Sequence, residues 1–207
     1  MFYSFGEIFN NAFSVIYTKV FWGTDKRIIR IPFRARNKKN IIIGKGFSCG
    51  YACRITAGDN EEHPVTIGNN VSLGDYCQIE GSGGVTIGDN VLMASKVFIT
   101  SNSHGCYSNK GEAPQASPEC PPADRPVIER SVRIGNNAWI GNGVSILMGV
   151  SIGKGAIIGA GSVVTKDIPE NCIAVGVPAE VIKVYNDEMQ VMIFYCQIKQ
   201  MELLQLI

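Results

Sequence analysis

The sequence has few of the residues on which most metal and redox sites depend. Histidine occurs only at His63 and His104, so the chain cannot by itself supply the three-histidine zinc site of a γ-class carbonic anhydrase. None of the seven cysteines forms a C-x-x-C pair, which disfavours a zinc ribbon or a redox motif. Charged residues make up 18% of the chain and the formal net charge is +1, so composition gives no general attraction to nucleic acid.

The chain also lacks a long uninterrupted apolar run. The most apolar N-terminal stretch contains Glu7 and Lys19, and it has no basic region or cleavage site typical of a secretion signal. Its apolar residues follow helical spacing: Phe2, Phe5, Phe9, Phe13, Ile16 and Val20. This spacing predicts an amphipathic helix within residues 1–25 that packs on the body of the protein. Its polar face is not rich in Lys and Arg, which disfavours a membrane-surface helix.

Aliphatic residues recur with a period of six through most of the chain. One run is Ile134, Ile140, Ile146, Ile152, Ile158 and Val164; an earlier one is Ile43, Cys49, Ile55, Ile67, Leu73 and Ile79, continued after a two-residue insertion by Ile87, Met93 and Ile99. Neither a flat strand nor an α-helix has this period. It predicts an all-β fold, a parallel β-helix, with Gly or Asn at its corners. Three cysteines fall in this pattern as small apolar residues, which indicates reduced thiols and a cytosolic location.

The period stops after Ile99 and resumes at Val132. The intervening segment holds five prolines and cannot stack as regular strands, so we expect a loop extruded over residues 100–131. The β-helix is predicted to occupy residues 26–183, and residues 184–207 are predicted to form a helix or an irregular tail.

The repeats "NAWIGNGV" and "IGAGSVVTKDIP" resemble those of the hexapeptide-repeat acyltransferase superfamily. Residues 87–183 are similar to galactoside, maltose and xenobiotic acetyltransferases, and "MASKVFITSNSHG" resembles bacterial O-antigen and capsule O-acetyltransferases. The resemblance covers residues 26–186. It implies a left-handed β-helix, acetyl-CoA as co-substrate without a required metal, and a homotrimer with active sites between neighbouring subunits.

His104 lies at the root of the predicted loop, where it matches the catalytic histidine of this family. A sugar hydroxyl is a weak nucleophile and must lose its proton as the new C–O bond forms. A neutral imidazole can accept that proton near neutral pH. The sequence therefore predicts His104 as the general base, against the alternative of a histidine that only hydrogen-bonds in a turn.

Three residues are candidates for the acceptor side. Asn102 and Ser103 precede His104 and could orient its imidazole or bind sugar hydroxyls. Asp75 is a further candidate, although an ordinary corner position of the β-helix explains it nearly as well. His63 follows acidic residues in a predicted loop, and we expect it at the surface.

The donor side is predicted from positions that match the family. They are Trp139 near the pantetheine arm, Asn142, Ala160 and Thr165 along the cofactor, and Lys166 and Lys183 near its phosphates. Glu180 departs from the family pattern, because several members carry Arg there, and this puts the strength of phosphate binding in doubt.

The resulting prediction is an acetyl-CoA-dependent O-acetyltransferase acting on a sugar of a surface polysaccharide. The acceptor would be nucleotide-linked, lipid-linked or polymeric; a lipid-linked acceptor would place the protein at the inner face of the membrane. Two alternatives stay open: a sugar N-acetyltransferase, and a non-enzymatic β-helix scaffold.

Overall fold

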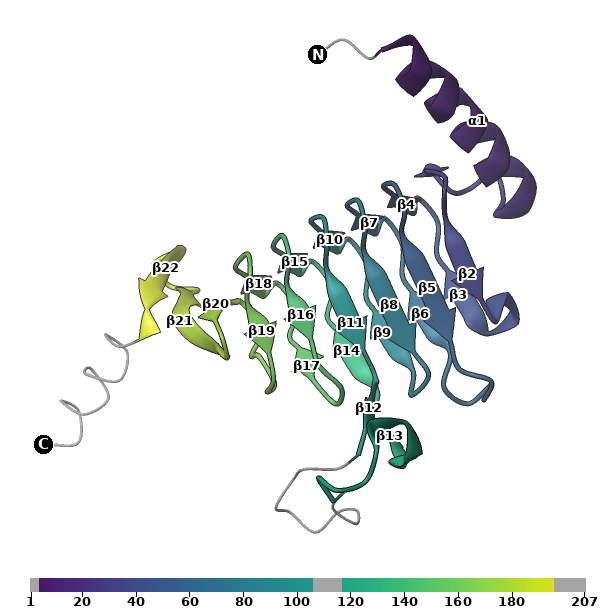
Figure 1. Ribbon diagram of the computed structural model, residues 1–207. Coiled ribbons are helices and arrows are strands. Elements are labelled where there is room, and N and C mark those ends of the chain that lie inside the picture. Colours follow the sequence, from purple (N-terminus) through teal and green to yellow (C-terminus); the bar gives the residue numbers. More distant parts are fainter. Residues whose placement is uncertain (1–3, 106–116, 196–207) are drawn as a thin grey trace, which may run out of the picture.

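The computed structural model describes residues 4–105 and 117–195. Figure 1 shows a row of stacked coils, with a helix at the N-terminal end and a hairpin at the C-terminal end. A two-stranded ribbon leaves the stack near its middle.

Most described strands lie in three sheets, one for each side of a triangular prism, and the strands within them are parallel except for β21 and β22 at the C-terminal end. The nine-stranded sheet contains β1 (Ile28–Ile29), β4 (Ser48–Cys49), β7 (Ser72–Leu73), β10 (Leu92–Met93), β15 (Trp139–Ile140), β18 (Ile157–Ile158), β20 (Cys172–Gly176), β21 (Ala179–Asn186) and β22 (Val191–Phe194). The six-stranded sheet contains β2 (Arg34–Arg36), β5 (Arg54–Ala57), β8 (Gln78–Gly81), β11 (Phe98–Thr100), β16 (Ser145–Ile146) and β19 (Val163–Val164). The five-stranded sheet contains β3 (Ile41–Ile43), β6 (Val65–Ile67), β9 (Val85–Ile87), β14 (Val132–Ile134) and β17 (Ser151–Ile152).

The six-residue period accounts for the core. Aliphatic residues of successive coils pair in register, as Ile79 does with Ile99 and Ile99 with Ile146, and all three are buried. Each coil thus stacks its inward side chains on those of the next and passes its backbone hydrogen bonds to the neighbouring coil. The predicted parallel β-helix is confirmed.

The glycine that follows many of the core residues is explained by close stacking between coils. A Cβ on Gly141 would lie 2.6 Å from the backbone nitrogen of Ala160 in the next coil. The left-handed backbone conformation instead falls at other corner positions, including Asn70, Asn90 and Asn137, and also at Tyr76 and Lys96. The corners are therefore less restricted to Gly and Asn than we expected.

The three edges of the prism are named here by one residue each. The Asn142 edge joins the nine-stranded to the six-stranded sheet, the His104 edge joins the six-stranded to the five-stranded sheet, and the Asn70 edge closes the triangle. Side-chain oxygens on these edges accept backbone N–H groups of the preceding coil, as Asp75 does from Tyr51 at 2.8 Å and Asp89 from Asn69 at 2.6 Å.

Helix α1 (Phe5–Phe21) corrects one prediction. It begins with a capping box between Ser4 and Glu7, as its sequence allows. Its buried residues, however, are Ser14 and Thr18, while the predicted apolar stripe faces outward. The hydroxyl of Thr18 accepts the N–H of Ile29 at 2.7 Å, and that of Ser14 accepts the N–H of Ile31 at 3.3 Å. The helix attaches through these hydroxyls because the first coil offers unpaired N–H groups there.

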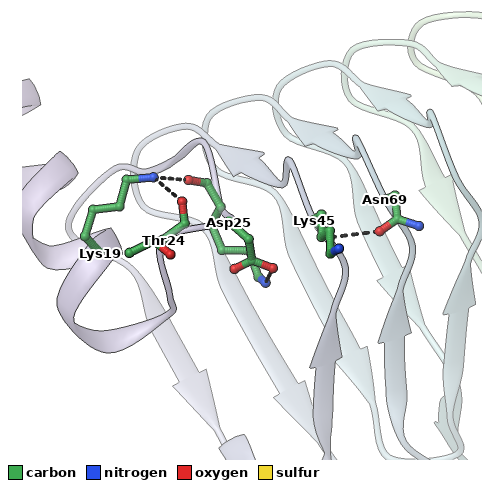
Figure 2. A network of polar contacts seen from close by, with 6 residues as sticks. Lys19, Thr24, Asp25, Lys45 and Asn69 are labelled. Carbon is green, nitrogen blue, oxygen red and sulfur yellow. Dashed lines mark hydrogen bonds and ion pairs between the residues drawn. The ribbon is translucent and has the colours of Figure 1, made fainter.

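The C-terminal end of α1 is tied to the turn that follows. The Lys19 ammonium donates to the carbonyl oxygens of Thr24 at 2.7 Å and Lys26 at 2.6 Å (Figure 2). Asp25 pairs with Lys26 at 2.8 Å, and this bond is the main cause that lowers the pKa of the Asp25 carboxyl. Among the described residues, no helix is long and apolar enough to cross a membrane.

The C-terminal region also differs from the prediction. Residues 179–194 form an antiparallel hairpin, β21 with β22, that continues the nine-stranded sheet. The predicted helix or tail is thus wrong for residues 184–194, because strand β21 pairs with β20 and extends well past the last coil. Residues 196–207 lie outside the described residues.

Candidate functional site

His104 ends strand β12 (Asn102–His104), which pairs antiparallel with β13 (Val127–Glu129). These strands form the ribbon that leaves the His104 edge in Figure 1. The short helix η2 (Pro122–Asp124) precedes β13, and residues 106–116 of the predicted loop lie outside the described residues. His104 is exposed and lies opposite Val127.

The root of the ribbon is held by buried and half-buried polar groups. The Asn102 side-chain amide donates to the Ser82 hydroxyl at 2.7 Å, and the Thr100 hydroxyl donates to the Asn102 side-chain oxygen at 3.2 Å. The Ser101 hydroxyl accepts the N–H of Gly83 at 2.8 Å. Because side chains alternate along a strand, Asn102 and His104 project from one face of the ribbon and Ser103 from the other. His104 is thus carried by a ribbon anchored on a rigid coil.

A cleft of about 300 Å³ lies beside this root. It is lined by polar residues from three segments: Glu62, His63, Thr86, Glu129, Ser131 and Arg133. Glu129 is the cross-strand partner of Asn102, so its side chain belongs to the ribbon face that carries His104. Sequence reasoning placed His63 at the surface but did not find Glu129 or Arg133. The alternation of Val132, Arg133 and Ile134 was the available signal for a strand returning to the β-helix.

Two predicted donor residues lie in a groove on the outer face of the nine-stranded sheet. Trp139, half of whose surface is exposed, and Asn142 line a groove of about 460 Å³ together with Leu92 and Ser95. Ala160 is exposed one coil farther along the same edge, where the N–H of Gly161 donates to the Asn142 carbonyl at 2.8 Å. The structure therefore brings Trp139, Asn142 and Ala160 together.

The other predicted donor residues lie elsewhere. Thr165 and Lys166 are exposed directly after β19, on the His104 edge. Lys183 lies on β21, where its ammonium is 4.5 Å from the centroid of the Phe194 ring. Within one chain, the predicted donor residues therefore lie on two different edges and on the C-terminal hairpin.

Asp75 lies on the Asn142 edge, between β7 and β8. Its carboxylate accepts the N–H of Tyr51, and its own N–H donates to the Ser95 hydroxyl at 3.0 Å. These bonds are those of a corner residue. Within one chain, the structure does not bring Asp75 to His104.

The buried cysteines serve the interior of the β-helix. Cys53 and Cys77 donate to the carbonyls of Gly74 and Ala94, each at 3.1 Å. The hydrogen bond with Cys49, followed by burial, raises the pKa of the Cys53 thiol to about 12. The hydrogen bond with Cys53, followed by burial, also raises the pKa of the Cys77 thiol. Such thiols are poor nucleophiles at neutral pH, as expected for small core residues.

Two family models match the chain. Residues 131–166 match the bacterial transferase hexapeptide (six repeats), and residues 64–101 match the hexapeptide repeat of succinyl-transferase. The putative lipopolysaccharide biosynthesis O-acetyl transferase WbbJ of Escherichia coli is 41% identical over 174 residues, which cover 84% of this chain and 86% of WbbJ. The chain belongs to the hexapeptide-repeat acyltransferase superfamily. The prism is accordingly a left-handed β-helix, and the protein is an acyltransferase.

Three further acyltransferases are similar to this chain in sequence or in structure. Galactoside O-acetyltransferase of Escherichia coli is 39% identical over 103 residues, 50% of this chain and 45% of that enzyme. The N-acyltransferase AntD of Bacillus cereus, solved with dTDP and 3-hydroxybutyryl-CoA, superimposes with a TM-score of 0.64 at 22% identity, covering 88% of this chain and 89% of AntD. The acetyltransferase domain of PglB from Neisseria gonorrhoeae, solved with acetyl coenzyme A, gives a TM-score of 0.54 at 17% identity, covering 76% and 57% of the two chains. At these identities the two structures show the shared fold alone.

Proposed function

We propose that this acyltransferase transfers the acetyl group of acetyl-CoA to a sugar hydroxyl in the synthesis of a surface polysaccharide, an O-antigen or a capsule. The likeness to WbbJ along most of both chains supports the reaction class and the biological role. The observation that carries the mechanism is the placement of His104, exposed at the end of a ribbon whose root is fixed by Asn102 and Ser101.

In this mechanism the neutral His104 imidazole removes the proton of the sugar hydroxyl as its oxygen attacks the thioester carbonyl. The resulting tetrahedral oxyanion collapses, the C–S bond breaks, and the imidazolium returns its proton to the leaving sulfur. Coenzyme A thiol and the acetylated sugar are the products. General-base assistance of this kind is worth roughly 10²–10⁴ in rate.

The division of the predicted residues between two edges supports a site shared by subunits of a homotrimer. Trp139 and Asn142 lie on one edge, whereas His104 and Lys166 lie on another. If the Asn142 edge of one subunit faces the His104 edge of its neighbour, one acetyl-CoA can contact both sets. The same arrangement would bring Asp75 of one subunit toward His104 of the next. The mass of the protein in solution, measured by light scattering, tests this assembly, and a monomer would contradict it.

Donor binding is assigned to the groove and the two lysines. The exposed Trp139 ring offers an apolar surface for the pantetheine arm, while Asn142 supplies an amide for its peptide-like groups. Lys166 and Lys183 would pair with the coenzyme A phosphates as point charges. For Lys183 this requires leaving the Phe194 ring, so its contribution is expected to be smaller than that of Lys166.

The polar cleft beside the ribbon is assigned to the acceptor. Carboxylates accept hydrogen bonds from sugar hydroxyls, and Arg133 donates to ring or hydroxyl oxygens or to a phosphate. Of the predicted acceptor residues, Asn102 is next to this cleft through its cross-strand partner Glu129, which lines it, whereas the Ser103 side chain projects from the other face of the ribbon.

The test is release of coenzyme A thiol from acetyl-CoA with a panel of sugars, sugar nucleotides and lipid-linked sugars. His104→Ala is expected to lower kcat by roughly 10²–10⁴. His63→Ala, at the same edge, is expected to act mainly on the KM for the acceptor. If His63→Ala removes turnover and His104→Ala does not, the assignment of the base is wrong.

Product chemistry separates the two acetyl-transfer reactions. An O-acetyl ester is released by mild alkali, whereas an N-acetyl amide survives it, so survival of the acetyl group would favour the N-acetyltransferase. The proposed reaction uses no metal, and we expect a chelator to leave turnover unchanged. We place the enzyme in the cytoplasm, at the inner face of the membrane, because a lipid-linked acceptor would be presented there.

A further inference from the structure

Charge is strongly segregated along this nearly neutral chain. Residues 1–58 contain ten Lys and Arg against two Asp and Glu, whereas residues 59–207 contain nine against sixteen. Between residues 26 and 58 there are nine cations and no acidic residue. Three of these cations are ion-paired, Lys26 with Asp25, Lys39 with Glu61 and Arg54 with Glu80. The first two coils, with strands β1 to β5, are nevertheless a basic end on a protein whose remaining coils carry more acidic than basic residues.

The exposed face of α1 adjoins this basic end. Phe5 is 86% exposed, Phe9 77%, Phe13 61% and Val20 68%. With Ile16 they form one continuous apolar stripe along the helix, opposite Ser14 and Thr18, which hold the helix to the first coil. In Figure 1 the helix stands off the end of the prism. The exposure of the stripe and the contacts of Ser14 and Thr18 on the other side of the helix show that the stripe faces away from the coils.

Apolar and cationic groups meet at the C-terminal end of α1. A groove of about 450 Å³ is lined by Tyr17, Phe21, Trp22 and Phe33, with Arg34, Arg36 and Lys38 along it. Trp22 packs edge-on against Phe33, at 5.4 Å between centroids, and the Lys38 ammonium lies 4.2 Å from the centroid of the Trp22 ring. Arg34 and Arg36 are exposed.

We infer that helix α1 and the basic end form a docking surface for an anionic membrane. The apolar stripe would enter the boundary between headgroups and acyl chains, and the nearby cations would contact lipid phosphates. Charge complementarity selects this occupant over a second copy of the chain, because a symmetric pair using this patch would place two strongly basic ends against each other. This inference reverses the expectation drawn from the helix sequence alone, because the cations come from the adjoining coil and not from the polar face of α1. It deepens the location proposed above and does not depend on the reaction.

Co-sedimentation with vesicles tests the inference, using the full chain and phosphatidylcholine vesicles with and without phosphatidylglycerol. We expect the protein to bind the anionic vesicles at least roughly tenfold more tightly, with the difference lost at high salt. Arg34→Gln with Arg36→Gln should weaken anionic binding roughly 25-fold, from about fivefold per cation. The matched control, Lys154→Gln on the Asn70 edge, should leave binding unchanged.

The apolar contribution is tested by Phe5→Gln, Phe9→Gln and Phe13→Gln together. These side chains are exposed, so the variant should fold and retain thiol release with a water-soluble acceptor, while vesicle binding falls more than about tenfold. Met189→Gln with Val191→Gln, exposed on the opposite end of the prism, serves as the control and should bind as the original protein does.

Trp22 reports the geometry directly. In a Trp139→Phe background it is the sole tryptophan, and brominated lipids in anionic vesicles should quench it. Three results would each overturn the inference. They are the absence of quenching, equal binding to neutral and anionic vesicles, and a triple Phe variant that loses its oligomeric state but keeps vesicle binding. The last result would make this face an interface between copies. Failure of vesicle binding with intact thiol release would leave the proposed reaction standing.

Discussion

Ser101→Ala probes the anchor that positions the candidate base. The Ser101 side chain is fully buried, its hydroxyl accepts the Gly83 N–H at 2.8 Å, and it donates to the Glu80 carbonyl at 3.2 Å. That carbonyl also accepts the Ser101 N–H at 2.9 Å, so it keeps a partner in the variant. The loss is therefore mainly one buried N–H without an acceptor, which costs ~1–3 kcal/mol of unfolding free energy.

For a chain of this size, each kcal/mol lowers the midpoint of thermal unfolding by roughly 2–4 °C. We expect a decrease of about 4–8 °C for a loss near the middle of that range, measured at fixed protein concentration because the assembly affects the midpoint. We also expect a lower kcat, since the Ser101 hydroxyl ties the root of the ribbon to Gly83 in the preceding coil, whereas the bond from the Arg130 N–H to the Ser101 backbone carbonyl at 2.9 Å is kept in the variant. Ser145→Ala, half-buried on the outer face of β16, is the control. If Ser101→Ala shifts the midpoint no more than this control does, the anchoring argument is refuted.

Three further predictions address the attachment of α1, the buried thiols and the helix cap. Thr18→Val removes the acceptor of the Ile29 N–H and should lower unfolding free energy by ~1–3 kcal/mol; an unchanged denaturation midpoint would contradict the attachment. The pKa of Cys53 is raised to about 12 in the folded protein, so this thiol ionises at lower pH in the unfolded chain, and the free energy of unfolding should fall as the pH rises from about 9 towards 12. In peptide mapping at mildly alkaline pH, the partly exposed Cys120 should be alkylated much faster than Cys53. Hydrogen bonds with the Ser4 N–H and hydroxyl lower the pKa of the Glu7 carboxyl, so the helix cap should weaken as the pH falls through that lowered pKa. The measurement is the helical circular dichroism signal, which should decrease over this pH range in the original protein but not in Glu7→Gln.

The fold could be predicted from the sequence because the period of six is a local property that maps directly onto register. Ile134 to Val164 each occupy the inward position of one side of a coil, and no long-range information is needed to assign them. The face by which α1 attaches could not be predicted in this way. An apolar stripe normally marks the buried side of a helix, but the first coil presents backbone N–H groups, which Ser14 and Thr18 satisfy and phenylalanines cannot.

The candidate site was predictable in part. Asn142 and Ala160 are eighteen residues apart, one full coil of three hexapeptides, so their shared edge follows from the period. The same counting fails across residues 100–131, because a loop of unknown path separates His104 from the later coils. Glu129 and Arg133 follow that loop. The antiparallel register of β12 with β13 places Glu129 on the ribbon face of His104, and Arg133 is placed by the pairing of β14 with β9.

The attachment of α1 has a consequence for the length of the molecule. A β-helix has no intrinsic end, since each coil is a template for another and its open edge can pair with a second chain. Thr18 and Ser14 occupy two of the donors through which another coil would add, and at the opposite end the antiparallel hairpin β21–β22 replaces the next parallel coil of the nine-stranded sheet. A chain without α1 would thus expose a growing edge, and we expect it to form end-to-end fibres where the full chain stays a discrete particle.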